Sequence, residues 1–101
     1  MSKNFKETIQ TSNKPVVINF SATWCGPCRM FAPIFDQVQS DLSNDFAIEK
    51  CDIDECEQFA NENNIASVPT TIVYKDGRET ARRSGAFPNA ETFESWIKQN
   101  S

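Results

Sequence analysis

Two cysteines, Cys25 and Cys28, are separated by two residues and follow directly after an apolar run. Such a pair can alternate between dithiol and disulfide and can thereby pass two electrons to a partner disulfide. Residues Val16–Phe20 are rich in β-branched side chains, which predicts a buried strand. Residues Arg29–Leu42 carry apolar side chains at a spacing of three and four, which predicts one face of a helix. The cysteine pair is therefore expected where a strand hands over to a helix.

A helix start changes the chemistry of a sulfur placed there. Its unpaired backbone N–H groups stabilise an anion, so we expect this position to lower the pKa of the Cys25 thiol and to favour the thiolate. Gly26 has no Cβ to clash, and Pro27 suits a first helical turn, where its missing N–H has no partner to lose. Cys28 follows one turn later, within reach of a short disulfide, and is expected to be less exposed than Cys25. These positions predict that Cys25 attacks and Cys28 resolves.

Two further cysteines, Cys51 and Cys56, allow other interpretations. Together with the first pair they could supply four sulfur ligands to zinc. Zinc knuckles usually carry their cysteines on loops, whereas a predicted strand precedes the first pair here, so we expect no metal. Haem attachment is excluded because no histidine is present. Cys51 is interpreted as a small buried hydrophobe in a strand, and Cys56 opens a helix where its thiol could be reactive or merely packed.

The composition bounds the function. With 101 residues the chain is expected to form a single domain spanning positions 1–101. A net charge of −4 argues against a nucleic-acid surface, and no apolar run is long enough for a signal peptide or a membrane span. We therefore expect a cytoplasmic protein, in which a Cys-x-x-Cys pair is more often catalytic than structural. Because histidine is absent, the nucleophile must be activated by its surroundings.

Strand and helix patterns alternate along the chain, which predicts an α/β fold. The two strands before and after the long helix need a crossover and should be parallel. Asp76-Gly77 predicts a tight hairpin. The remaining expected helices and strands are the helices Asn4–Ser12, Glu55–Asn63 and one capped by Asn89, and the strands Phe46–Ile53, Val68–Tyr74 and Arg78–Arg83.

The residues from Phe20 to Met30, with Trp24-Cys25-Gly26-Pro27-Cys28 at their centre, closely resemble the thioredoxin family, especially its cytosolic eukaryotic members. Val68-Pro69-Thr70 and Asp76-Gly77 follow at fitting distances, so the resemblance covers nearly the whole chain from Lys14 onward. It implies a thioredoxin-like three-layer α/β sandwich with a central mixed sheet of four to five strands. Only fourteen residues precede Pro15, so the first edge strand is expected to be shortened or absent.

The resemblance also implies a substrate groove beside the cysteines. Pro69 would be in the cis form and face the redox pair. The walls would be formed by Trp24, Val68 and the Gly85-Ala86 stretch. Trp24 could instead be a half-buried packing residue, but an aromatic side chain next to an exposed nucleophile is more often a contact surface.

The implied activity is the reduction of protein disulfides, including those of peroxiredoxin-type enzymes. Electrons would return from NADPH through a thioredoxin reductase, so the chain, expected to be a monomer, would bind no cofactor itself. Two interpretations from other classes stay open. One is an interaction module in which the redox state only gates binding, and the other is a metal-binding protein that uses all four sulfurs.

One departure from the family concerns proton transfer. Asn19 stands where the family has a buried aspartate that is thought to help deprotonate the resolving sulfur, and an amide cannot accept a proton and hold it. Lys50 matches the usual lysine partner of that aspartate and would lack a buried counter-charge. We expect a nearby cation to favour the thiolates, and the missing base to slow release of the mixed disulfide.

Overall fold

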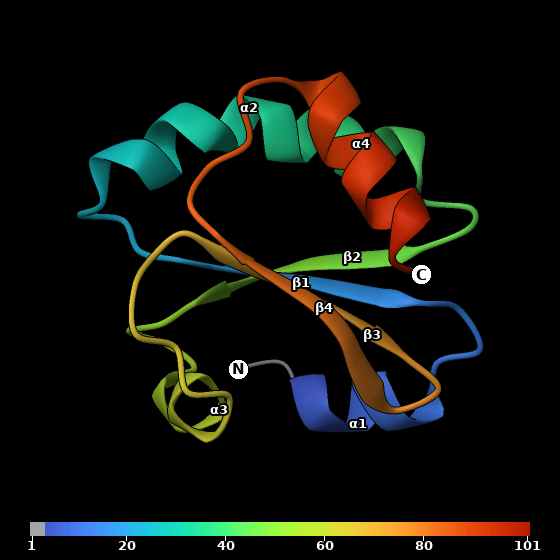
Figure 1. Ribbon diagram of the computed structural model, residues 1–101. Coiled ribbons are helices and arrows are strands. Elements are labelled where there is room, and N and C mark those ends of the chain that lie inside the picture. Colours follow the sequence, from blue (N-terminus) through green and yellow to red (C-terminus); the bar gives the residue numbers. More distant parts are fainter. Residues whose placement is uncertain (1–3) are drawn as a thin grey trace.

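The computed structural model describes residues 4–101 as one four-stranded sheet with helices on both faces (Figure 1). Figure 1 shows α2 and α4 above the sheet and α1 and α3 below it. In chain order the helices and strands are α1 (Phe5–Thr11), β1 (Val16–Ser21), α2 (Gly26–Asp41), β2 (Ala47–Asp52), α3 (Glu57–Glu62), β3 (Thr70–Lys75), β4 (Arg78–Ser84) and α4 (Ala90–Gln99).

The strand order β2-β1-β3-β4 confirms the expected mixed sheet. β1 and β2 are parallel, as the helical crossover predicts, while β3 is antiparallel to both β1 and β4. At the predicted hairpin, Asp76 and Gly77 have φ angles of 53° and 82°, the left-handed conformation that a tight two-residue turn needs. Residues 4–14 contain α1 but no strand. The expectation of a shortened first strand also depends on positions 1–3, which lie outside the described residues.

Two elements begin two residues later than the sequence predicts. The predicted helix Glu55–Asn63 begins only at Glu57, because a turn follows β2: the carbonyl of Asp52 accepts the N–H groups of Glu55 and Cys56, both at 2.9 Å. The predicted strand from Val68 begins only at Thr70, after a proline that has no N–H to offer a neighbouring strand.

The alternation of side chains along β1 decides which residues lie below the cysteine pair. Val17 belongs to the core cluster formed with α2 and α4, whereas Ile18 and Phe20 belong to the cluster on the α1 and α3 side. Successive strand residues face opposite sides, so Asn19 shares the α2 face with Val17. Its neighbours in the register are Lys50 on β2 and Thr71 on β3. The central strand thus presents a polar residue to the helix that carries Cys28.

The last helix packs as its sequence pattern predicts. Phe93 and Ile97 are fully buried in the α2-side core, and Trp96 packs against it in part. Asn89 caps α4, since its side-chain oxygen accepts the N–H of Thr92 at 2.8 Å. α4 therefore packs beside α2 on the same face of the sheet.

Candidate active site

The first cysteine occupies the cap of α2, as expected. The helix begins at Gly26, and the N–H of Cys28 donates to Cys25 Sγ at 3.2 Å. Pro27 lies in the first turn, where its missing N–H costs no hydrogen bond. A disulfide joins Cys25 and Cys28, whose Cα atoms are 5.2 Å apart. In the dithiol state the same N–H would stabilise negative charge on the Cys25 sulfur.

The expected difference in exposure between the two cysteines is wrong. Cys25 is 6% exposed and Cys28 is 7% exposed. Cys25 is covered because Val68 and Ile53 pack against it, with the Val68 carbonyl oxygen 3.7 Å from Cys25 Sγ. The two residues differ instead in the cavity that each one lines: Cys25 lines a groove of about 480 Å³, and Cys28 lines a separate cavity of about 180 Å³.

The larger cavity is the groove beside Cys25. Of the residues implied for a substrate groove or motif, Trp24, Gly26, Pro27 and Val68 line it. Pro69, Gly85 and Ala86 are not among its lining residues. The Val68–Pro69 peptide bond is cis, the Pro69 carbonyl accepts the Gly85 N–H at 2.8 Å, and Ala86 packs against the core.

Sequence reasoning missed the opposite wall of this groove. It comes from the start of the turn after β2 and from the segment that leads into β3, and its residues are Ile53, Ile65, Ala66 and Ser67. The apolar Ile65-Ala66 step directly before Ser67 and Val68 was the available signal. A helix lies between the two segments, so only the fold brings them together.

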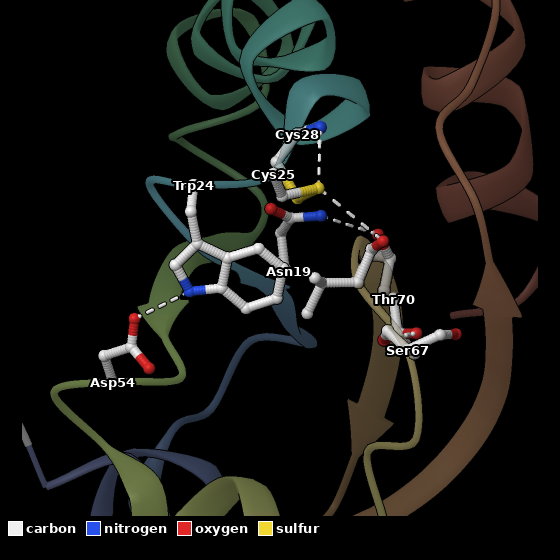
Figure 2. Close-up of a disulfide and its surroundings, with 9 residues drawn as sticks. Asn19, Trp24, Cys25, Cys28, Asp54, Ser67 and Thr70 are labelled. Carbon is white, nitrogen blue, oxygen red and sulfur yellow. Dashed lines mark hydrogen bonds between the residues drawn. A yellow bond between two sulfur atoms is a disulfide. The ribbon is translucent and has the colours of Figure 1, made fainter.

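The Trp24 side chain is exposed, and a hydrogen bond fixes its orientation. Its side chain is 64% exposed, which excludes a purely internal packing role. The indole N–H donates to Asp54 Oδ2 at 3.0 Å, as Figure 2 shows. Asp54, which was not singled out in the sequence, therefore fixes the direction of an apolar surface beside the reactive sulfur.

Asn19 is buried on the α2 face and satisfied by a neutral partner. It is 1% exposed, and its side-chain N–H donates to the hydroxyl of the fully buried Thr71 at 3.1 Å. Figure 2 draws Asn19 among the residues that surround the disulfide. The strand below the cysteines thus presents an amide rather than a group that can hold a proton.

Lys50 lies close to Cys28 without being buried. It lines the 180 Å³ cavity together with Cys28 and Asp52, and its ammonium group lies 4.9 Å from the centre of the Phe35 ring. Because its side chain is exposed to solvent, it needs no buried counter-charge. Asn19, its neighbour in the register, offers it no buried counter-charge, as expected, and Lys50 lies where β2 reaches the surface.

The other two cysteines form a second disulfide, which the sequence did not predict. Cys51 is 1% exposed, in agreement with its expected burial in a strand, and it is bonded to Cys56 at the start of α3. Among residues 4–101, no three His, Cys, Asp or Glu side chains gather to hold a metal ion. Over the same range, no helix combines the length and apolar character needed to cross a bilayer.

The sequence of this chain is similar to those of known proteins. The family model Thioredoxin matches residues 1–99. A thioredoxin of Mycobacterium tuberculosis is 39% identical over 83 residues, which cover 82% of this chain and 72% of that protein. The bifunctional thioredoxin reductase/thioredoxin of Mycobacterium leprae is 39% identical over 83 residues, 82% of this chain and 18% of that protein.

Two solved structures share the fold. Oxidised mitochondrial thioredoxin 3 of Saccharomyces cerevisiae superposes with a TM-score of 0.81 at 36% identity, covering 94% of this chain and 86% of that one. A chain from a study of thiol resolution in yeast mitochondrial 1-Cys peroxiredoxin through the glutathione/thioredoxin systems superposes with a TM-score of 0.82 at 35% identity, with the same coverage.

Proposed function

Because the chain belongs to the thioredoxin family of disulfide oxidoreductases, we propose that it reduces protein disulfides with Cys25 as the attacking and Cys28 as the resolving residue. The observation that carries the proposal is the position of Cys25 Sγ. It receives a backbone N–H at the start of α2, and its residue lines the 480 Å³ groove. The N–H favours the thiolate, and the groove gives a substrate access to it.

The reaction divides into two displacements. The Cys25 thiolate attacks one sulfur of the substrate disulfide, the substrate S–S bond breaks, and the other substrate sulfur leaves as a thiolate. Cys28 then loses its proton and attacks Cys25 Sγ, which releases the first substrate sulfur as a second thiolate. Two electrons have passed to the substrate, and the chain keeps the Cys25–Cys28 disulfide that the structure contains.

The groove provides the substrate contact. Trp24 presents an exposed apolar face whose direction is fixed by Asp54, and Val68 presents its carbonyl next to Cys25 Sγ. An extended substrate segment can lie between these two groups with its disulfide at the sulfur. Pro69 follows Val68 directly, and its carbonyl accepts the Gly85 N–H, which ties this wall to the residue after β4.

The partners follow from the same chemistry. We propose a thioredoxin reductase that uses NADPH as the electron donor, in line with the fused reductase named for the Mycobacterium leprae relative. Peroxiredoxin-type enzymes are proposed substrates, in line with the yeast study that contains a similar chain. We propose that the chain works as a cytoplasmic monomer of one domain without a bound cofactor, and without nucleic-acid or membrane partners.

The test is insulin reduction with NADPH and a thioredoxin reductase as the sole source of electrons. We expect the chain to couple NADPH oxidation to precipitation of the insulin chains. A chain that binds insulin but gives no turnover, with the reductase shown to be active on another thioredoxin, would overturn the proposal in favour of an interaction module.

Removing the exposed indole should affect binding more than chemistry. We expect Trp24→Ala to raise the KM for insulin by roughly tenfold, as truncation of an interface aromatic does, with kcat little changed. Met30→Ala is the matched control, because Met30 is 79% exposed one turn along α2 but does not line the groove. Equal KM values for the two variants would remove Trp24 from the substrate surface.

A further inference from the structure

The second disulfide encloses one wall of the groove. Cys51 lies in β2 and is packed into the core cluster on the α1 and α3 side, whereas Cys56 caps α3 and lines an open surface pocket of about 580 Å³. Their Cα atoms are 6.3 Å apart, and the bond closes a ring around residues 52–55. One sulfur is thus internal and the other is accessible from outside.

Two of the enclosed residues shape the groove. Ile53 lines it and packs against the cluster formed by Ala22, Cys25 and Cys28, and Asp54 accepts the indole N–H of Trp24. Asp52 holds the turn from inside: its carboxylate accepts the Asp54 N–H at 2.9 Å, and its carbonyl accepts two further N–H groups. Any loosening of this turn therefore moves two of the groups that a substrate would meet.

We propose that Cys51 and Cys56 form a second redox centre that regulates the groove. When the pair is oxidised, the ring holds residues 52–55 in place and keeps the groove shaped for its substrate. When the pair is reduced, the turn loses this cross-link and the groove binds protein disulfides less tightly. The regulatory effect rests on the proposed reductase function, whereas the existence of the second centre does not.

The oxidant class is a hydroperoxide. The accessible Cys56 sulfur attacks the peroxide, whose O–O bond breaks to give a sulfenic acid and an alcohol or water. The Cys51 thiol then attacks that sulfur, a water molecule leaves, and the disulfide forms. The two thiols have lost two electrons and two protons, which appear in the reduced peroxide and the water.

Reduction of this pair should be slow. An incoming thiolate must attack Cys56, because Cys51 is 1% exposed, and Cys51 must then leave as an anion inside an apolar cluster. Burial disfavours that anion, so it is a poor leaving group. Glu55 and Glu57 line the same pocket as Cys56 and oppose the approach of anionic thiols. The catalytic pair can therefore cycle while the second pair stays oxidised.

Two preparations of the natural chain test the proposal. In one, the reductase and NADPH act briefly; in the other, excess dithiothreitol reduces both pairs. Alkylation and peptide mapping should find only Cys25 and Cys28 modified in the first and all four cysteines modified in the second. If the pair at Cys51 and Cys56 is reduced as fast as the catalytic pair, the independent second centre is refuted.

Amide hydrogen exchange measures how easily the turn opens, independently of catalysis. We expect the amides of Glu55 and Cys56 to exchange roughly tenfold faster once the second pair is reduced, as local opening becomes easier. The KM for insulin should rise about threefold between the two preparations, since the wall is less well organised. Unchanged exchange would refute the proposed fixing of the turn, and changed exchange with an unchanged KM would refute its effect on the groove.

Two variants complete the design. The double variant Cys51→Val, Cys56→Ser should show one KM in both preparations. In the double variant Cys25→Ser, Cys28→Ser, hydrogen peroxide should remove two hydrogens from the mass without adding oxygen, and stable sulfinic acid instead would refute the pairing. Absence of insulin turnover in every form would refute the proposed function alone, because exchange and mass still decide whether the second centre exists.

Discussion

Replacing Cys25 with serine should lower the rate of insulin reduction by at least about a thousandfold, because a hydroxyl is hardly ionised near neutral pH and is a far weaker nucleophile than a thiolate. The N–H of Cys28 that stabilises charge on the sulfur has no comparable anion to act on in the variant. The measurement is the initial rate of NADPH oxidation with insulin and the reductase. Thermal unfolding of the variant establishes that the fold is retained.

Cys28→Ser is the matched variant, since it makes the same chemical change three residues further on, in the first turn of α2. It should also stop turnover, but it should accumulate covalent complexes between Cys25 and its substrates, because the second displacement is lost. Mass spectrometry under non-reducing conditions identifies these complexes. Residual turnover by Cys25→Ser, or trapping through any cysteine other than Cys25, would contradict the assignment of the two roles.

Asn19→Asp should accelerate the second displacement. The introduced carboxyl would lie on the α2 face below the cysteine pair and could accept the proton of Cys28, which Asn19 cannot do. General-base catalysis contributes about 10²- to 10⁴-fold in favourable geometry, so we expect at least a roughly tenfold gain at neutral pH. The measurement is the release of 5-thio-2-nitrobenzoate from a mixed disulfide preformed on Cys25, followed against pH.

The same substitution should also lower stability, and more so at high pH. Burial raises the pKa of the introduced carboxyl above its unfolded value of about 4, because Asn19 is 1% exposed and Lys50 is solvent-exposed. A raised folded-state pKa means that the variant is least destabilised below about pH 4 and loses stability as the pH rises through the folded value. We expect a loss of about 3 kcal/mol in the free energy of unfolding at pH 8.

Asn89→Asp is the control for both effects. It makes the same chemical change at the cap of α4, where asparagine and aspartate are equally good caps, so neither the release rate nor its pH profile should change. Identical release profiles for the natural chain and Asn19→Asp would end the idea that the missing carboxylate limits resolution. Equal stability of the two at pH 8 would show that the introduced group is not desolvated.

Lys50 places a positive group near the resolving cysteine. Lys50 keeps its ammonium group in solvent, over the Phe35 ring, at the edge of the cavity that Cys28 lines. A cation in this place can favour a thiolate on Cys28 without the cost of a buried charge. The site therefore has a positive group on one side of the resolving sulfur and a neutral amide below it.

Local residues alone determined the catalytic pair and the elements that carry it. The β-branched run of β1, the apolar spacing of α2 and the intervening Gly26-Pro27 step act over one or two turns of chain, so the cap at Cys25 was predictable. The hairpin at Asp76-Gly77 and the cap at Asn89 were predictable for the same reason. In each case the interacting atoms lie within a few residues of one another.

Only the tertiary structure decided which distant segments meet at the sulfurs. The equal burial of Cys25 and Cys28, the groove wall at Ile53 and Ile65, and the contact between Trp24 and Asp54 depend on segments that meet at the end of the sheet where β1 and β2 finish. Cys51 and Cys56 can form a disulfide because the turn between β2 and the shortened α3 brings their side chains together. On one continuous strand or helix, these two side chains would point in different directions. Local sequence determines the chemical character of a residue, whereas the tertiary fold determines which distant residues it can contact.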